Sequence, residues 1–235
     1  MPDLSARATG PEIMDDLHVS GPDLDQALIE LDGINYLLGG NYVTLNAVTH
    51  VLGKGSGPVK YRIADLGCGS GDILRRIRSL MNKRNIDASL TGFDANPNVI
   101  KFAVAKTPAT CRIQFEAVNI FSEEFRSRRF DVVTATLFFH HFTNNELIGF
   151  FNGLKEQVSL AMIINDIHRH WFAYHAIKWL TRIFSRSEMV KHDAAVSVAR
   201  AFTKAELKNI LRQAGLRKYR IKWCWAFRWQ VIVWF

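Results

Sequence analysis

The sequence contains few of the features that define disulfide-stabilised, membrane-spanning or repeat proteins. Its 235 residues include only three cysteines, which are too few and too widely spaced for a disulfide framework or a CxxC metal site. The longest apolar runs fall far short of the roughly 20 residues that a membrane-spanning helix needs. There is no internal repeat, and Met1–Gly10 lacks the basic-then-apolar pattern of a secretory signal, which favours a cytoplasmic location.

The composition excludes a wholly disordered chain and a fibrous rod. Hydrophobic residues make up 48% and charged residues 22%, as in globular proteins, and the length suits one large domain with short additions. An excess of 30 Lys and Arg over 22 Asp and Glu gives a net charge of +8. This excess suits nucleic acid, anionic lipid or an acidic metabolite, but it does not choose among them.

From residue 60 onward, short apolar runs alternate with helix-length amphipathic stretches. The runs predict strands at Tyr61–Leu66, Ser89–Phe93, Ile113–Ala117, Phe130–Thr136 and Leu160–Ile164. The stretches between them predict helices at Asp72–Met81, Asn98–Ala105 and Asn144–Gln157. Strand and helix in alternation indicate an α/β fold with a parallel sheet and helices on both faces. Two further strands, Arg220–Cys224 and Trp229–Trp234, are expected around a tight turn.

The remaining segments are helical or connecting. We expect Met1–Ser20 to be irregular and Asp23–Leu52 to form two helices, interrupted at Gly39–Gly40. A flexible connector is expected at Gly53–Gly57. His168–Arg186 predicts one strongly amphipathic helix. After a connecting segment, the capping box Thr203–Glu206 starts a helix that Gly215 ends.

A glycine-rich turn is the sharpest feature of the sequence. The segment Asp65–Asp72 reads DLGCGSGD, so a β-like run ends in Gly-x-Gly-x-Gly and a helix begins at once. Glycines let a backbone turn tightly, and the start of the helix favours an anionic group. An acidic residue is expected about 20 positions further on. Asp94 supplies it at the end of the next predicted strand, where a carboxylate can accept hydrogen bonds from both ribose hydroxyls.

This segment resembles motif I of the class I S-adenosylmethionine (SAM)-dependent methyltransferases, hhDhGCGxG. Dinucleotide sites usually carry Gly-x-Gly-x-x-Gly instead, so a nicotinamide enzyme is a distant alternative. The resemblance implies a Rossmann-like sheet of seven strands, mostly parallel with an antiparallel last strand. It also implies SAM as the cofactor, held by Asp65, Gly67, Cys68, Gly69, Gly71, Asp94, Ala95, Asn119, Ile120 and Thr136.

The end of the fourth predicted strand bears on the methyl acceptor. It reads TLFFHHF and lacks the Asn/Asp-Pro-Pro-aromatic motif of enzymes that methylate nucleic-acid amino groups, which argues against DNA. The LxxHH pattern instead resembles that of small-molecule methyltransferases, which makes His140 and His141 candidate catalytic residues. Asp166 and His168, expected in a loop after the fifth strand, could form a carboxylate–imidazole pair with His168 as the base. No group of His, Asp and Glu has convincing metal spacing, so we expect no metal.

The segment Ile34–Asn41, INYLLGGN, and the segments around Asn165 and Arg200 resemble those of bacterial ubiquinone-type and polyketide-phenol methyltransferases. This looser resemblance implies that residues 1–55 form a helical lid segment. Residues 56–235 would then be the methyltransferase domain, with a lid insertion at about 165–202. Arg200 or His192 could orient an acidic or phenolic substrate.

The resulting hypothesis is SAM-dependent O-methylation of a small molecule, a phenol or quinol. A non-catalytic SAM-binding regulatory or assembly module and an RNA methyltransferase are the alternatives. RNA is motivated by the net charge and by the basic residues Arg75, Arg76, Arg78, Lys83 and Arg84. Basic and aromatic residues on the helix at 168–186 also allow peripheral membrane contact. We favour an interpretation in which the apolar side of that helix packs on the domain and covers the substrate. The sequence leaves the oligomeric state open.

Overall fold

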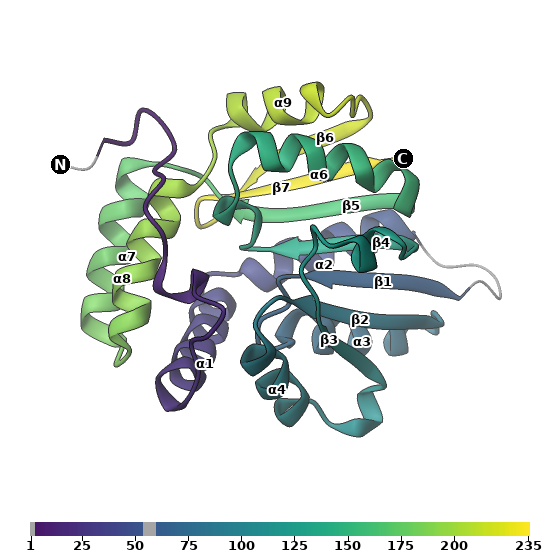
Figure 1. Cartoon of the computed structure of the whole chain (residues 1–235), viewed down its shortest axis with the longest axis horizontal. Coiled ribbons are helices and arrows are strands. Elements are labelled where there is room, and N and C mark those ends of the chain that lie inside the picture. The colour runs from purple at the N-terminus through teal and green to yellow at the C-terminus, as the bar shows by residue number, and fades with distance from the viewer. Residues whose placement is uncertain (1–2, 54–59) are drawn as a thin grey trace.

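The computed structural model describes residues 3–53 and 60–235 and contains one seven-stranded sheet (Figure 1). The strands are β1 Tyr61–Leu66, β2 Ala88–Asp94, β3 Ile113–Ala117, β4 Phe130–Thr136, β5 Val158–Ile167, β6 Tyr219–Cys224 and β7 Arg228–Trp234. Their spatial order is β3-β2-β1-β4-β5-β7-β6, and β7 runs antiparallel to both of its neighbours. The predicted fold class is confirmed. The predicted connector Gly53–Gly57 lies, beyond Gly53, outside the described residues.

Two helical layers cover the faces of the sheet. One contains α2 (Gly40–Leu52), α3 (Asp72–Arg84) and α4 (Pro97–Lys106), and the other contains α5 (Glu123–Arg126), α6 (Asn144–Gln157) and α9 (Lys204–Gln213). Ile63 of β1 packs into the first layer, and Ala64 and Leu66 pack into the second. A central parallel strand must be apolar on both faces, which explains its unbroken apolar run. Within the described ranges, no helix has the length and apolarity needed to cross a membrane.

A third group of helices lies beyond the carboxyl ends of the parallel strands. It contains α1 (Pro22–Leu37), α7 (Trp171–Phe184) and α8 (Glu188–Arg200), and α8 packs against both of the others (Figure 1). The predicted helix at 168–186 is confirmed with tighter bounds. The sequence analysis missed α8, because its buried face carries Asp193 and Arg200 beside apolar residues and so lacks a clean apolar stripe.

The N-terminal segment is irregular, as predicted, apart from the 3-10 turn η1 (Ile13–Asp15). It is nevertheless fastened to α8. The amide of Ala8 donates to the carbonyl of Ala199 at 3.0 Å, and the Asp193 carboxylate accepts the amide of Ile13 at 2.8 Å. These bonds hold η1 above the carboxyl edge of the sheet, where ligands bind in open α/β folds.

Candidate cofactor and active site

The glycine turn has the conformation that its sequence predicts. Gly67 and Gly71 have φ of +62° and +78°, a region that residues with a Cβ rarely adopt. A Cβ on Gly67 would also lie 2.1 Å from the Phe138 ring. β1 therefore ends in a tight turn, and α3 begins directly after it.

Two buried carboxylates support this turn. Asp94, at the end of β2, accepts the Gly69 amide at 3.3 Å and the Asn96 amide at 3.1 Å. Burial raises the pKa of Asp94, and these amide bonds oppose the rise. Asp65 accepts the Thr134 hydroxyl at 2.6 Å, and its burial raises the pKa of that carboxyl to about 7. Both side chains are thus fixed before any ligand binds.

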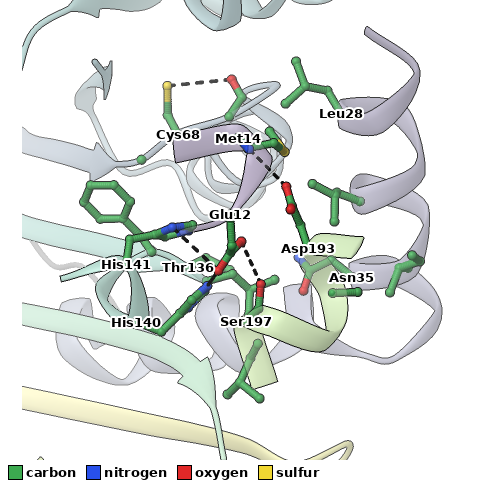
Figure 2. A pocket seen from close by; sticks show the side chains of 18 of the residues that line it. Glu12, Met14, Leu28, Asn35, Cys68, Thr136, His140, His141, Asp193 and Ser197 are labelled. Carbon is green, nitrogen blue, oxygen red and sulfur yellow. Dashed lines mark hydrogen bonds and ion pairs between the residues drawn. The ribbon is translucent and has the colours of Figure 1, made fainter. Parts of the chain in front are cut away.

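A cavity of about 800 Å³ opens above the turn. Every predicted cofactor residue lines this cavity except Gly71, which makes the turn without facing the space. Turn η1 and helices α1 and α8 contribute the opposite wall (Figure 2), together with residues of α7. The residues expected to form a lid therefore border the same space as the glycine turn; whether they move as a lid stays a prediction.

The chain leaves β4 in a way that delivers two histidines to the cavity. Leu137 has φ of +55°, uncommon for a leucine, and its amide donates to the Asn165 carbonyl at 2.8 Å. The short turn η3 (Phe139–His141) follows. This bend directs His140 and His141 toward η1, as Figure 2 shows.

His140 is buried between two carboxylates. Its Nδ1 lies 2.7 Å from Asp166 Oδ1, and its Nε2 lies 3.5 Å from Glu12 Oε1. Burial alone would lower the pKa of His140, but the two carboxylates outweigh it and raise the pKa to about 9. His140 is thus protonated at neutral pH and has no lone pair with which to accept a proton.

His141 has a different environment. Its Nδ1 lies 2.7 Å from Asp15 Oδ1. Burial opposes ionisation of Asp15, but bonds to His141 and Arg200 prevail and hold the pKa of Asp15 well below its usual range. A carboxylate at Nδ1 keeps the proton on that nitrogen and leaves the lone pair on Nε2. Both histidines line the cavity, but His140 is buried with a carboxylate at each ring nitrogen, so among the described residues His141 is the imidazole with a nitrogen free for a ligand.

The predicted pairing of Asp166 with His168 is wrong. β5 continues to Ile167 instead of ending at Ile164, so Asp166 lies within the strand and pairs with His140. The His168 ring packs 4.7 Å from that of Trp229, and its Nδ1 lies 3.3 Å from the Trp223 indole nitrogen. Neither Asp166 nor His168 lines the cavity.

Arg200 and His192 are not placed to orient a substrate. Arg200 is buried and donates to the Asp15 carboxylate and to the carbonyls of His140 and His141. It therefore fixes η3 against η1. His192 is half exposed on α8, pairs with Asp193 and does not line the cavity.

The sequence analysis missed three residues of this site, Glu12, Asp15 and Arg228. Arg228 is buried and lines the cavity, and its Nη1 has no hydrogen-bond partner within the described residues. Burial lowers the pKa of Arg228 to about 10, and Asp166 opposes the shift. It remains a cation at neutral pH. No local pattern could have identified these residues, since each acts on groups far away in the sequence.

The structure also assembles a group that could hold a cation. Ligand atoms of Glu12, His140 and His141 lie within 4.8 Å of one another. Residue spacing does not reveal this group, because Glu12 lies far from His140 and His141 in the sequence. His140 is already engaged as a cation by two carboxylates, and a metal would have to displace its proton.

We therefore expect activity to survive exposure to excess chelator. The measurement is the rate of methyl transfer after dialysis against EDTA, with Mg²⁺, Mn²⁺ and Zn²⁺ each added back. A rate that falls to background and is restored by one of these ions would assign the metal to the group of Glu12, His140 and His141.

Comparison with known proteins gives these features a family. Residues 63–159 match the family described as "Methyltransferase domain". The plantazolicin methyltransferase BpumL, solved in complex with SAH, has 18% identity and a TM-score of 0.62 over 90% of this chain and 93% of its own. No curated protein matches the sequence.

Two other solved structures share the fold at lower identity. Human N-acetylserotonin methyltransferase with SAM is 15% identical, with a TM-score of 0.63 over 90% of this chain and 55% of its own. Magnesium protoporphyrin IX methyltransferase of Synechocystis PCC 6803 with bound SAM is 13% identical, with a TM-score of 0.56 over 94% and 87%.

The sheet order, the glycine turn after β1 and the acid that ends β2 define the class I methyltransferase fold. Together with the family match over residues 63–159, they show that the chain contains a class I SAM-dependent methyltransferase domain.

Replacing Asp94 with alanine tests the cofactor site. The change removes the carboxylate expected to bind the ribose, and we expect SAM affinity to fall at least tenfold, about 1.4 kcal/mol. Calorimetric titration of both proteins measures this. Asp87→Ala, at a residue outside the cavity, is the control. Equal affinities for all three proteins would contradict the assignment.

Proposed function

We propose that this methyltransferase transfers the methyl group of SAM to the hydroxyl of a small phenol or quinol. The observation that carries the proposal is the pair of Asp15 and His141 at the cavity wall, 2.7 Å apart. A base oriented by a carboxylate is the arrangement that removes a proton from a hydroxyl nucleophile.

The reaction is an in-line displacement at the methyl carbon. The acceptor oxygen forms the new C–O bond while the C–S bond breaks. The electron pair of the broken C–S bond stays on the sulfur, so that SAH leaves. The hydroxyl proton passes to His141 Nε2, and the Asp15 carboxylate stabilises the resulting imidazolium. Alignment of oxygen, methyl and sulfur supplies much of the rate. His140 holds η3 and η1 together instead of exchanging protons.

The wall of the cavity supports an aromatic acceptor. Phe138, Phe142 and Phe172 line it, and its surface is mainly apolar. Phe138 and Phe142 form an edge-to-face pair with ring centroids 5.0 Å apart. Such faces favour a planar ring of small-molecule size. The similar structures are named as methyltransferases of plantazolicin, N-acetylserotonin and magnesium protoporphyrin IX, which supports an acceptor of the small-molecule class.

Arg228 supports an acceptor that carries an anionic group. Its buried guanidinium has an unpartnered donor and lies at the cavity, so it favours a carboxylate or a phenolate there. In the proposed reaction it takes the orienting role that the sequence analysis gave to Arg200 or His192.

The test is a screen of acceptors with isotope-labelled SAM. Phenols, quinols and phenolic acids are compared with matched anilines and thiophenols, and the labelled methyl is located in the product by NMR. We expect an O-methyl ether. Turnover confined to amines or thiols would contradict the proposal. SAM binding without turnover of any acceptor would support the cofactor site but contradict methyl transfer to a hydroxyl.

RNA is the less favoured acceptor. The arginines of α3 are engaged within the protein: Arg76 pairs with Asp72 at 2.9 Å, and Arg75 and Arg78 donate to backbone carbonyls. A strongly salt-dependent affinity for bulk RNA would restore this alternative.

A further inference from the structure

Helix α7 exposes much of the apolar side that was expected to pack on the domain. Ala173 is buried, and Ala176, Ile177 and Leu180 face the cavity, as a cover would. Trp179, Ile183 and Phe184 point outward instead, and that part of the prediction is wrong: Trp179 is 65% exposed and Phe184 72% exposed. The helix lies beside α8 at the edge of the molecule, and no other helix or strand of residues 3–53 and 60–235 covers its outer side (Figure 1).

The exposed apolar surface continues onto the turn between β6 and β7. Trp171 and Phe172 at the start of α7 have ring centroids 5.7 Å apart, and Phe172 lies 5.8 Å from Phe227 of that turn. Phe227 in turn lies 6.0 Å from Trp223, and Trp225 beside it is 73% exposed. We call this continuous patch, with Trp179, Ile183 and Phe184, the aromatic rim. A patch of this kind marks an interaction site.

The exposed charges around the aromatic rim are mostly positive, and the acidic residues near it, Glu30 and Glu188, lie at the end where the Glu30 carboxylate accepts the Arg186 amide at 2.9 Å. Exposed cations flank it at Lys178, Arg182 and Arg186 on one side and at Arg220 and Lys222 on the other. There is no Asp or Glu between residues 167 and 187, and none between 207 and 235. A protein partner would need an unusually acidic surface to match this, whereas an anionic bilayer supplies negative charge and apolar depth together.

We propose that the aromatic rim docks the enzyme on an anionic membrane surface. On α7, the stripe Phe172, Ala176, Trp179 and Ile183 lies next to the stripe Trp171, His175, Lys178 and Arg182, which is the pattern of an interfacial helix. Tryptophan side chains suit the headgroup level of a bilayer. The docking itself does not depend on the acceptor.

One consequence rests on the proposed function. Phe172 and Trp225 belong to the aromatic rim and also line the cavity. An acceptor with a lipid tail could therefore keep its tail in the bilayer while its phenolic head enters the cavity.

The experiment is co-sedimentation of the full chain with vesicles. Vesicles of phosphatidylcholine alone are compared with vesicles that contain phosphatidylglycerol, each at low and at physiological salt. We expect binding only to the anionic vesicles, weakened by salt. Trp179→Ala with Phe184→Ala should reduce this binding at least tenfold. Neither residue lines the cavity, so SAM affinity and turnover of a water-soluble acceptor should not change.

Two further variants make the result decisive. Lys178→Glu with Arg182→Glu should abolish the preference for anionic vesicles. Val104→Ala on α4, which removes an exposed apolar side chain far from the rim, should bind like the unaltered protein. Equal binding to neutral vesicles, or no binding to any vesicle, would overturn the proposal. A dimer in solution that Trp179→Ala dissociates, without vesicle binding, would assign the rim to a second copy of the chain and would also overturn it.

Discussion

Replacing His141 with asparagine is expected to lower kcat by about 10²- to 10⁴-fold, the usual contribution of a positioned general base. The affinity for SAM should change little, because the cofactor is bound by the glycine turn and Asp94. The loss should depend on the acidity of the acceptor. A nitrophenol assayed at about pH 8, where it is mostly ionised, has little need of a base and should lose far less than an unsubstituted phenol.

This dependence separates a chemical role from a structural one. A variant that merely distorted the cavity would slow all acceptors equally. His192→Asn is the matched control, since His192 also pairs with a carboxylate but does not line the cavity. The kcat of Asp15→Asn should lie between those of His141→Asn and His192→Asn. The amide that replaces the Asp15 carboxylate can still hold the His141 ring but does not stabilise an imidazolium. Equal losses for nitrophenol and phenol would remove His141 from the base role.

The sequence alone predicts the sheet well, because each strand is formed by one short continuous run of apolar residues. β1, β3 and β4 have the bounds that their apolar runs predict, and the glycine turn follows β1 as expected. Motif I and Asp94 could also be identified from the sequence, because a strand, a glycine turn and an acidic residue at fixed spacing together form a local pattern that is typical of this site. All predicted cofactor residues but one accordingly line a single cavity.

The carboxylates that pair with the two predicted histidines could not be identified in the same way. Asp166 pairs with His140 because β5 runs three residues further than its apolar run, and polar residues at a strand end give no signal of that length. Glu12 and Asp15 come from an irregular segment whose position depends on α8. Sequence spacing predicts which residues meet within one helix, strand or turn. It does not predict contacts made when an N-terminal loop folds back onto the end of a strand.

His140 carries the largest expected effect on stability. His140→Gln removes the cation nearest to Asp166 and Glu12, both nine-tenths or more buried. Glu12 then keeps the longer ion pair with Arg200 at 3.9 Å. Breaking a buried pair in this way costs about 3–5 kcal/mol. Urea unfolding at pH 6 measures the loss. His192→Gln breaks a pair in which the histidine is half exposed. Asp193 keeps its bonds from the Ile13 and Met14 amides, so this change should cost at most about 1 kcal/mol.

The pH dependence of this loss identifies its electrostatic origin. A free imidazole has a pKa near 6.5, whereas the folded protein raises the pKa of His140 to about 9. A group whose pKa is raised by folding stabilises the protein fully below the unfolded value, and that contribution disappears as the pH rises through the folded value. The gap between the unaltered protein and His140→Gln should therefore be widest at pH 6 and shrink towards pH 9. A gap that stays constant across this range would mean that His140 is neutral and acts by packing alone, and the base assignment would then have to be divided between the two histidines.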